Sequence, residues 1–387
     1  MNWQALVDEA RVIQWRRYLH QHAETAFKEV ETTRYICEVL SAFPQLELLR
    51  PTETGVVAVL RGAKPGKVVA LRADIDALPM VEEADVEFPS LNRGAMHACG
   101  HDAHTAMLLG AAQVLSQLQS ELCGTVKFMF QPAEEQFPGG AKGLIESGVL
   151  DDVDCFFGEH IVANTPVDKL CCWPGPMTAS PDQFTITIRG RGSHGASPEA
   201  SIDPITIGAQ LVCALNTIVS RNISPLDNAV VTVAKFTGGT SFNIIPPSAE
   251  LSGTVRTFDP AIRARVRERM AALAEHTCAA YGAECTLDYI EGYDAVQNDP
   301  ALVEIVHKVA GEVMGPDSLR RVRSLMAGDD YASYQKVAPV AFMLIGAGVE
   351  ADGCGYQAHH PKFKLDERML ANGVKMFVGC TLEALSR

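Results

Sequence analysis

The chain has 387 residues, of which 47% are hydrophobic and 21% are charged, so its composition is that of a globular protein long enough for two domains. Its formal net charge of −14 argues against nucleic acid and against an anionic membrane surface as partners. A small anionic substrate is still compatible with this charge, because a bound metal or local arginines can reverse the field.

Three features predict a cytoplasmic protein. No apolar run approaches the length of a membrane span. The first residues lead directly into an amphipathic pattern and not into a signal peptide. The eleven cysteines are irregularly spaced and include no Cys-x-x-Cys, as expected of reduced thiols.

Strands alternate with helices in the first part of the chain, which predicts an α/β domain with a mainly parallel sheet. The expected helices cover residues 3–20, 30–43 and 141–147, and another follows residue 105. The expected strands cover residues 55–60, 67–76, 125–130 and 154–158. Because parallel strands end at one edge of a sheet, residues after these strands are expected to meet there.

The order of the expected strands and helices changes after about residue 180 and predicts an inserted α+β domain. Strand, helix, strand, strand, helix and strand are expected at residues 184–188, 203–221, 230–234, 251–256, 260–281 and 284–289. The α/β rhythm then returns, with a helix at 300–313, a strand at 340–345 and a helix at 367–385. The predicted domains are therefore 1–180 and 294–387 for the catalytic domain and 181–293 for the insert.

Metal-type ligands are concentrated between residues 97 and 105, which hold three histidines, Cys99 and Asp102. Cysteine and histidine together suit zinc or its divalent neighbours. The alternative is a polar turn in which Asp102 caps the following helix. That alternative explains Asp102 but neither Cys99 nor His101.

Further candidates stand at the ends of the expected strands. They are Asp74 and Asp76, Glu134 and Glu135, His160, and one of His359 and His360. Taken alone, the aspartates are equally compatible with a turn and His160 with a hydrogen-bonded core histidine, whereas the glutamate pair and the histidine pair are better explained as exposed turns. Their joint occurrence favours a centre for two divalent cations, in which one of two adjacent glutamates binds metal while its neighbour moves a proton.

These motifs resemble the M20 metallopeptidase family, and within it the branch of hippurate hydrolases, N-acyl-amino-acid amidohydrolases and auxin-conjugate hydrolases. The resemblance lies in residues 72–79 (RADIDALP), 97–102 (HACGHD), 131–135 (QPAEE) and 359–361 (HHP). Matches at 17–20 (RYLH) and 253–256 (GTVR) extend it over nearly the whole chain.

The resemblance implies two divalent metal ions per subunit, chosen from Mn, Zn, Co and Ni. Their implied ligands are Cys99, His101, Glu135, His160 and His359. Glu134 would be the general base that later protonates the leaving amine, and Asp76 would orient a metal ligand.

The resemblance also implies that the insert is a lid through which the chain forms a homodimer. His194 would polarise the scissile carbonyl, and Asn243 and Arg256 would hold the carboxylate of the substrate. Each has an alternative. His194 can be an exposed residue of a glycine-rich turn, Asn243 can serve the turn before Pro246, and Arg256 can pair with Asp259.

Four segments depart from the family pattern without removing an implied ligand or the base. They are Ala23-Glu24-Thr25-Ala26, Glu159, Ser197-Pro198-Glu199 and Gly328-Asp329-Asp330-Tyr331. These departures affect the expected substrate more than the reaction.

The sequence therefore predicts a metal-dependent hydrolase of linear amide bonds. Its expected partner is a small N-acyl amino acid with a free carboxylate, from which it releases a carboxylic acid and a free amino acid. A dipeptidase or carboxypeptidase on the same scaffold is the nearest alternative. A metal- or ligand-binding protein without catalysis is the other alternative, and it leaves Glu134 without a purpose.

Overall fold

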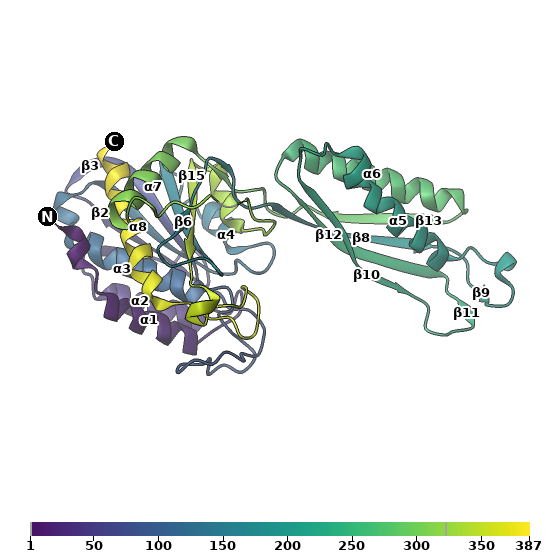
Figure 1. Cartoon of the computed structure of the whole chain (residues 1–387), viewed down its shortest axis with the longest axis horizontal. Helices are drawn as coiled ribbons and strands as arrows, with labels where there is room; N and C mark the ends of the chain where they lie inside the picture. Colours follow the sequence, from purple (N-terminus) through teal and green to yellow (C-terminus); the bar gives the residue numbers. More distant parts are fainter. Residues whose placement is uncertain (1, 322) are drawn as a thin grey trace. The chain divides into compact units, whose positions relative to one another are not determined.

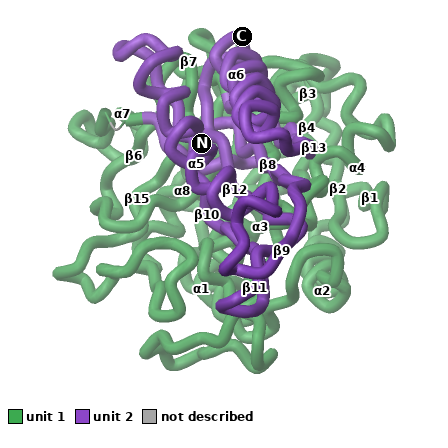
Figure 2. The backbone as a smooth tube through the Cα atoms, turned by 90° about the vertical axis from the view of Figure 1, so that its right-hand side faces the viewer, with its two compact units in different colours: residues 1–177, 297–323, 330–387 green, residues 178–296, 324–329 purple. Residues whose placement is uncertain are grey.

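The computed structural model describes residues 2–321 and 323–387, which form two compact units (Figures 1 and 2). Unit 1 comprises the described residues of 1–177, 297–323 and 330–387, and unit 2 comprises 178–296 and 324–329. The domain boundaries expected after residues 180 and 293 stay predictions. Met1, with which the predicted first domain begins, lies outside the described residues.

Unit 1 contains a seven-stranded sheet in the order β1-β2-β4-β3-β5-β15-β6. The four central strands β4, β3, β5 and β15 are parallel, whereas β1, β2 and β6 pair in an antiparallel manner. The predicted mainly parallel α/β sheet is therefore confirmed. Its strands are β1 (Leu46–Leu49), β2 (Val56–Arg61), β3 (Lys64–Asp74), β4 (Cys123–Gln131), β5 (Cys155–Val162), β6 (Leu170–Cys171) and β15 (Val340–Gly346).

Helices cover one face of this sheet with apolar side chains, and α3 and α8 lie side by side (Figure 1). The helices are α1 (Glu9–Gln21), α2 (Val30–Ser41), α3 (His101–Gln117), α7 (Pro300–Val313) and α8 (Leu370–Ser386). On the other face, Phe156 of β5 stacks on Tyr334 of η4 (Asp330–Lys336) with 5.2 Å between the ring centroids. Because both faces are covered, β15 is apolar and buried along its whole length.

The short elements of unit 1 complete its surface. They are η1 (Trp3–Leu6), η2 (Gln119–Glu121), α4 (Gly140–Glu146), η5 (Glu350–Asp352), η6 (Glu367–Met369) and the paired strands β7 (Gly175–Pro176) and β14 (Gln297–Asn298).

Two expectations were wrong in extent. The first helix is interrupted, because Asp8 caps a new helix by accepting from the backbone of Arg11. β5 continues through His160, which pairs in register with Leu344, so this histidine lies within the strand.

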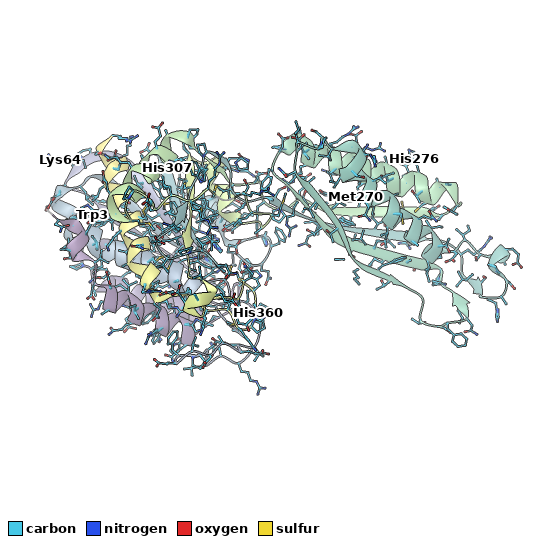
Figure 3. The ribbon with its side chains drawn as sticks, viewed as in Figure 1. Trp3, Lys64, Met270, His276, His307 and His360 are labelled. Carbon is cyan, nitrogen blue, oxygen red and sulfur yellow. The ribbon has the colours of Figure 1, made fainter. Side chains whose placement is uncertain are left out.

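Unit 2 is the predicted α+β segment, a four-stranded antiparallel sheet in the order β10-β12-β8-β13 with two helices packed on it. Met270 of α6, labelled in Figure 3, is fully buried in its core. The expected β-α-β-β-α-β order is confirmed. Its elements are β8 (Ser180–Arg189), β9 (Ser193–His194), η3 (Pro198–Ala200), α5 (Pro204–Asn222), β10 (Ala229–Gly238), β11 (Ile244–Ile245), β12 (Ser248–Thr257), α6 (Pro260–Ala280) and β13 (Glu284–Ile290).

Helix ends in unit 2 follow from local chemistry. Asp203 and Asp259 each accept hydrogen bonds from the first backbone N–H groups of α5 and α6, and a proline follows each aspartate. Among the described residues of both units, no helix combines the length and the apolarity needed to cross a membrane.

Candidate metal centre

The five implied metal ligands all belong to unit 1, where the topology brings them to one edge of the sheet. Donor atoms of Cys99, His101 and His160 lie within 4.8 Å of one another, and so do those of Cys99, Glu135 and His359. Cys99 is common to both groups, so all five residues surround one point of the fold. Two overlapping donor groups of this kind are compatible with a pair of ions.

His101 is buried at the first position of α3, and its ring is oriented by Asp76. Its Nδ1–H donates to the backbone carbonyl of Asp76 at 2.9 Å and lies 3.2 Å from the carboxylate. A carbonyl oxygen can only accept, so Nδ1 carries a proton and Nε2 is the nitrogen that can bind a metal. In the described part of the chain this Nε2 has no hydrogen-bond partner, as expected of a ligand atom.

The same argument fixes the tautomer of His160. Its Nδ1–H donates to the backbone carbonyl of Ile161 at 2.7 Å, and its Nε2 lies 3.4 Å from the sulfur of Cys99. Burial lowers the pKa of His160, which favours the neutral imidazole that binds metals. Both histidines therefore present Nε2 toward Cys99 or its immediate surroundings.

Asp76 also positions the glutamate ligand. One oxygen of its carboxylate accepts from the backbone N–H of Glu135 at 3.0 Å, while the other faces His101. This geometry supports the orienting role predicted for Asp76. The side chain of Glu135 in turn lies 3.0 Å from Nε2 of His359.

The structure separates His359 from its neighbour His360. His359 has a left-handed backbone with φ of 68°, and its N–H donates to the carbonyl of Ala98 at 2.8 Å. This conformation directs its ring to Glu135. His360, labelled in Figure 3, instead stacks on Tyr356 with 4.4 Å between the ring centroids and accepts from the backbone of Lys362.

Electrostatics at the centre favour a bound cation. Burial, followed by the negative charges of Glu135 and Glu134, raises the pKa of the Cys99 thiol well above its usual value. Burial lowers the pKa of His101, but Asp74 and the hydrogen bond to Asp76 outweigh it and raise this pKa to about 10, so a metal that binds Nε2 displaces a proton from it. A divalent ion would offset the excess of negative charge around this thiol and lower its pKa. Nitrogen, sulfur and oxygen donors together suit zinc or its divalent neighbours, so the residues fit the implied metal pair.

Glu134 lies beside the ligands and is only 9% exposed. Carboxylate oxygens of Glu134 and Glu135 lie within 4.8 Å of each other and of a ring nitrogen of His101. The left-handed residue before it, Ala133, has φ of 52° and turns the chain so that these consecutive glutamates both reach the centre.

Two contacts near the centre could not be assigned from the sequence. His104 donates from Nδ1 to Asp74 at 2.6 Å and accepts at Nε2 from the N–H of Ile161, so both nitrogens are used within the protein. His104 therefore holds the strand beside His160. Its spacing of one helical turn from His101 is the only signal in the sequence.

The alternative role of Asp102 as a helix cap was wrong. The N-cap residue of α3 is Gly100, in a left-handed conformation, and it makes no side-chain capping bond. Asp102 is buried in the first turn, where it accepts from Nδ1 of His20 at 2.8 Å and lies 2.8 Å from Nε of Arg16. Asp102 thus links the segment that carries Cys99 and His101 to α1.

The implied carbonyl polariser His194 and the two implied substrate-binding residues belong to unit 2 and are held locally. His194 is exposed in β9 and accepts at Nδ1 from the N–H of Ala196. Asn243 is exposed and accepts from the hydroxyl of Ser241 at 2.8 Å. Arg256 is half-buried and donates to Thr254 and to a backbone carbonyl. Its alternative partner Asp259 instead caps α6, so the expected rival pairing is wrong.

The family departure Glu159 is fully buried behind the site. Within the described residues, neither of its oxygens has a hydrogen-bond partner. Burial raises its pKa well above the usual value, so the side chain is held in the neutral form. A neutral residue here leaves the field at His160 nearly unchanged.

A comparison with known proteins decides the family. The model of Peptidase family M20/M25/M40 matches residues 70–383. The chain belongs to this family. The prediction of a hydrolase acting on amide bonds is confirmed by this membership.

Curated relatives cover most of the chain. An N-acyl-L-amino acid amidohydrolase of Geobacillus stearothermophilus is 48% identical over 76% of this chain and 80% of its own length. An N-acetylcysteine deacetylase of Bacillus subtilis is 42% identical over 95% of both chains. Thermostable carboxypeptidase 1 of Saccharolobus solfataricus is 38% identical over 94% of this chain and 92% of its own.

A solved structure from Bacillus subtilis, described as a dinuclear metal binding peptidase of the M20 family, superposes with a TM-score of 0.86. It is 38% identical, and the superposition covers 98% of both chains. The description of this neighbour as dinuclear is consistent with the donor groups around Cys99.

Proposed function

We propose that the chain hydrolyses the amide bond of N-acyl amino acids and releases a carboxylic acid and a free amino acid. One observation carries the proposal: Cys99 and four further metal-type donors lie together, and a sixth residue, Glu134, lies beside them as a second carboxylate. The relatives named for deacylation of amino acids support the substrate class.

The ions are held by Cys99, His101, Glu135, His160 and His359, and Asp76 orients two of these residues. When bound, Mn, Zn, Co or Ni supplies Lewis acidity and lowers the pKa of water. The protein contributes fixed tautomers at His101 and His160, so the donors are arranged before the ions arrive.

Glu134 moves the proton. It precedes the ligand Glu135, which faces His359, and its own carboxylate lies within 4.8 Å of a ring nitrogen of His101. Glu134 accepts a proton from the attacking water and then delivers it to the nitrogen of the leaving amine. The exchange leaves Glu134 ionised again after each turnover.

Unit 2 recognises the substrate in this proposal. His194 donates to the oxygen of the scissile carbonyl as negative charge develops on it. Asn243 and Arg256 bind the carboxylate of the amino acid, and Arg256 is suited to this because a guanidinium stays charged even though burial lowers its pKa. In the described residues, Arg256 makes no ion pair that would compete with the substrate.

The test is a substrate panel. Protein stripped with a chelator and reloaded with Mn or Zn is assayed for free amino acid released from N-acetyl and N-benzoyl amino acids and from dipeptides. We expect no turnover by the stripped protein and metal-restored hydrolysis of the acylated set. Absence of hydrolysis with two ions verifiably bound would contradict the proposal.

A carboxypeptidase or dipeptidase activity is the second candidate, favoured by the similarity to a thermostable carboxypeptidase. The discriminating feature is the free amino group of a peptide. Faster hydrolysis of dipeptides than of the matching N-acetyl amino acids would favour this candidate.

We also propose a cytoplasmic homodimer. All eleven cysteines are free thiols in the structure, which suits a reducing compartment. In unit 2, β10 is an edge strand with exposed Phe236, and Phe242 and Ile244 are exposed nearby in the chain. Light scattering with size-exclusion chromatography tests the dimer, and a monomer at micromolar concentration would contradict it.

A further inference from the structure

Glu29 is a buried acid that the proposed mechanism does not use. It immediately precedes α2, its side chain makes no capping bond to that helix, and it has no solvent exposure. One oxygen of its carboxylate accepts from the backbone N–H of Ala133 at 2.8 Å. The two residues are 104 positions apart in the chain.

Ala133 is the residue that turns the chain into Glu134. Its left-handed conformation costs about 1 kcal/mol for a residue with a Cβ, so it persists only where neighbouring contacts hold it. Its N–H is bound by Glu29, and its carbonyl accepts from the N–H of Gly140 at 3.1 Å. The turn is therefore held at both of its peptide groups.

Close packing fixes the residue before the turn. That residue is Pro132. A Cβ on Gly140 would lie 1.8 Å from the carbonyl oxygen of Pro132, and a Cβ on Gly55 would lie 2.7 Å from the Pro132 ring. Two carboxylates then bind alternate N–H groups beyond it, Glu29 at Ala133 and Asp76 at Glu135. Glu134 stands between these two anchored positions.

Burying Glu29 is unfavourable for the fold. Burial is the main cause that raises its pKa to about 7, and the nearby charge of Asp76 adds to it. Within the described residues no ion pair compensates for this burial. A carboxyl group kept at such a cost is expected where its hydrogen bond has a use.

We propose that Glu29 is a positioning residue for amide hydrolysis, which holds the turn at Ala133 so that Glu134 and Glu135 face the metal centre. The inference rests on the proposed function for its effect on rate. Its effects on metal affinity and on the Ala133 amide do not depend on the substrate.

The test compares Glu29→Ala with Glu29→Gln in the full chain loaded with Mn or Zn. The amide oxygen of glutamine can still accept from Ala133, whereas alanine cannot. We expect Glu29→Ala to lower kcat by roughly 10- to 100-fold with little change in KM, and to weaken binding of one ion by a similar factor. Glu29→Gln is expected to stay within about threefold of the wild type in both quantities, since its hydrogen bond is retained.

Glu24→Ala is the matched control. Glu24 lies on the same segment and accepts from the N–H and the hydroxyl of Thr32, so its side chain supports α2 without touching the turn at Ala133. This control is expected to lower the unfolding temperature while kcat and metal affinity stay unchanged. Hydrogen exchange should be faster at the Ala133 amide in Glu29→Ala than in either Glu29→Gln or the control.

Equal kcat and metal affinity in Glu29→Ala and the wild type would overturn the inference. So would a loss of rate in the control as large as that in Glu29→Ala, because the role would then be structural. If Glu29→Ala does not fold, Glu29→Asp replaces it, since its carboxylate is one methylene shorter and cannot reach Ala133. Absence of turnover by the wild type would remove only the proposed function, because metal affinity and amide exchange still test Glu29.

Discussion

The predicted ligands in unit 1 and the predicted substrate residues in unit 2 are held in different ways. His101 and His160 are fixed by hydrogen bonds from their Nδ1 atoms to backbone carbonyls, and their surroundings are buried. His194 and Asn243 are exposed, and their side-chain bonds reach only two residues along the chain. The difference supports the proposal of a metal centre arranged by folding and a recognition surface that the substrate completes.

The largest expected effect tests the metal centre of unit 1. Glu134→Ala should lower kcat by about 10³-fold or more, because the variant lacks the carboxylate proposed to move the proton. Metal content, measured by mass spectrometry of the loaded protein, should be unchanged. Retained activity in the metal-loaded variant would contradict the role of Glu134.

The next effect tests unit 2. His194→Ala should lower kcat by roughly 10²-fold, the loss typical of one donor to a developing oxyanion. The unfolding temperature should not change, since the side chain is exposed. Loss of metal from this variant would mean that His194 is a ligand, and it would contradict the assignment of metal binding to unit 1 and substrate recognition to unit 2.

A smaller effect is expected for Arg256→Lys. Lysine keeps the charge but loses the paired donors that match a carboxylate, so KM for N-acyl amino acids should rise about tenfold with kcat nearly constant. The matching amino-acid amides, which lack the carboxylate, serve as the control substrates. An equal rise in KM for both substrate sets would contradict carboxylate recognition by Arg256.

The last prediction concerns stability, not turnover, and sharpens the contrast in burial. The folded state raises the pKa of Glu29 from 4.5 to about 7, so it binds this proton more tightly than the unfolded chain does. The stabilisation that comes from this proton on Glu29 is complete below pH 4.5 and is lost as the pH rises through 7. Glu29→Gln does not titrate, so in urea unfolding of chelator-treated protein it should gain roughly 3 kcal/mol over the wild type between pH 4.5 and pH 8. A difference between the two proteins that does not vary with pH would contradict the raised pKa.

Local patterns predicted much of the fold and of the candidate site. Cys99 and His101 open a helix, Glu134 and Glu135 follow a strand, and parallel pairing of β3, β4 and β5 brings such positions together. Alternation and length were enough to predict the β-α-β-β-α-β order of unit 2.

Other features depend on contacts between distant segments, and no local pattern carries them. The bond from Glu29 to Ala133 and the link from Asp102 to His20 join segments 104 and 82 residues apart. The choice between His359 and His360 depends on a left-handed backbone that binds the carbonyl of Ala98. The continuation of β5 through His160 depends on pairing with β15, near the other end of the chain.

The most direct test of the account is the number of ions that the chain binds tightly when one shared donor is removed. Cys99→Ala is compared with Cys213→Ala, which removes an exposed thiol of α5, by dialysis against Zn followed by metal analysis. We expect two ions per chain in the wild type and in Cys213→Ala, and fewer than two in Cys99→Ala. Two ions bound equally tightly by all three proteins would contradict a centre built around Cys99.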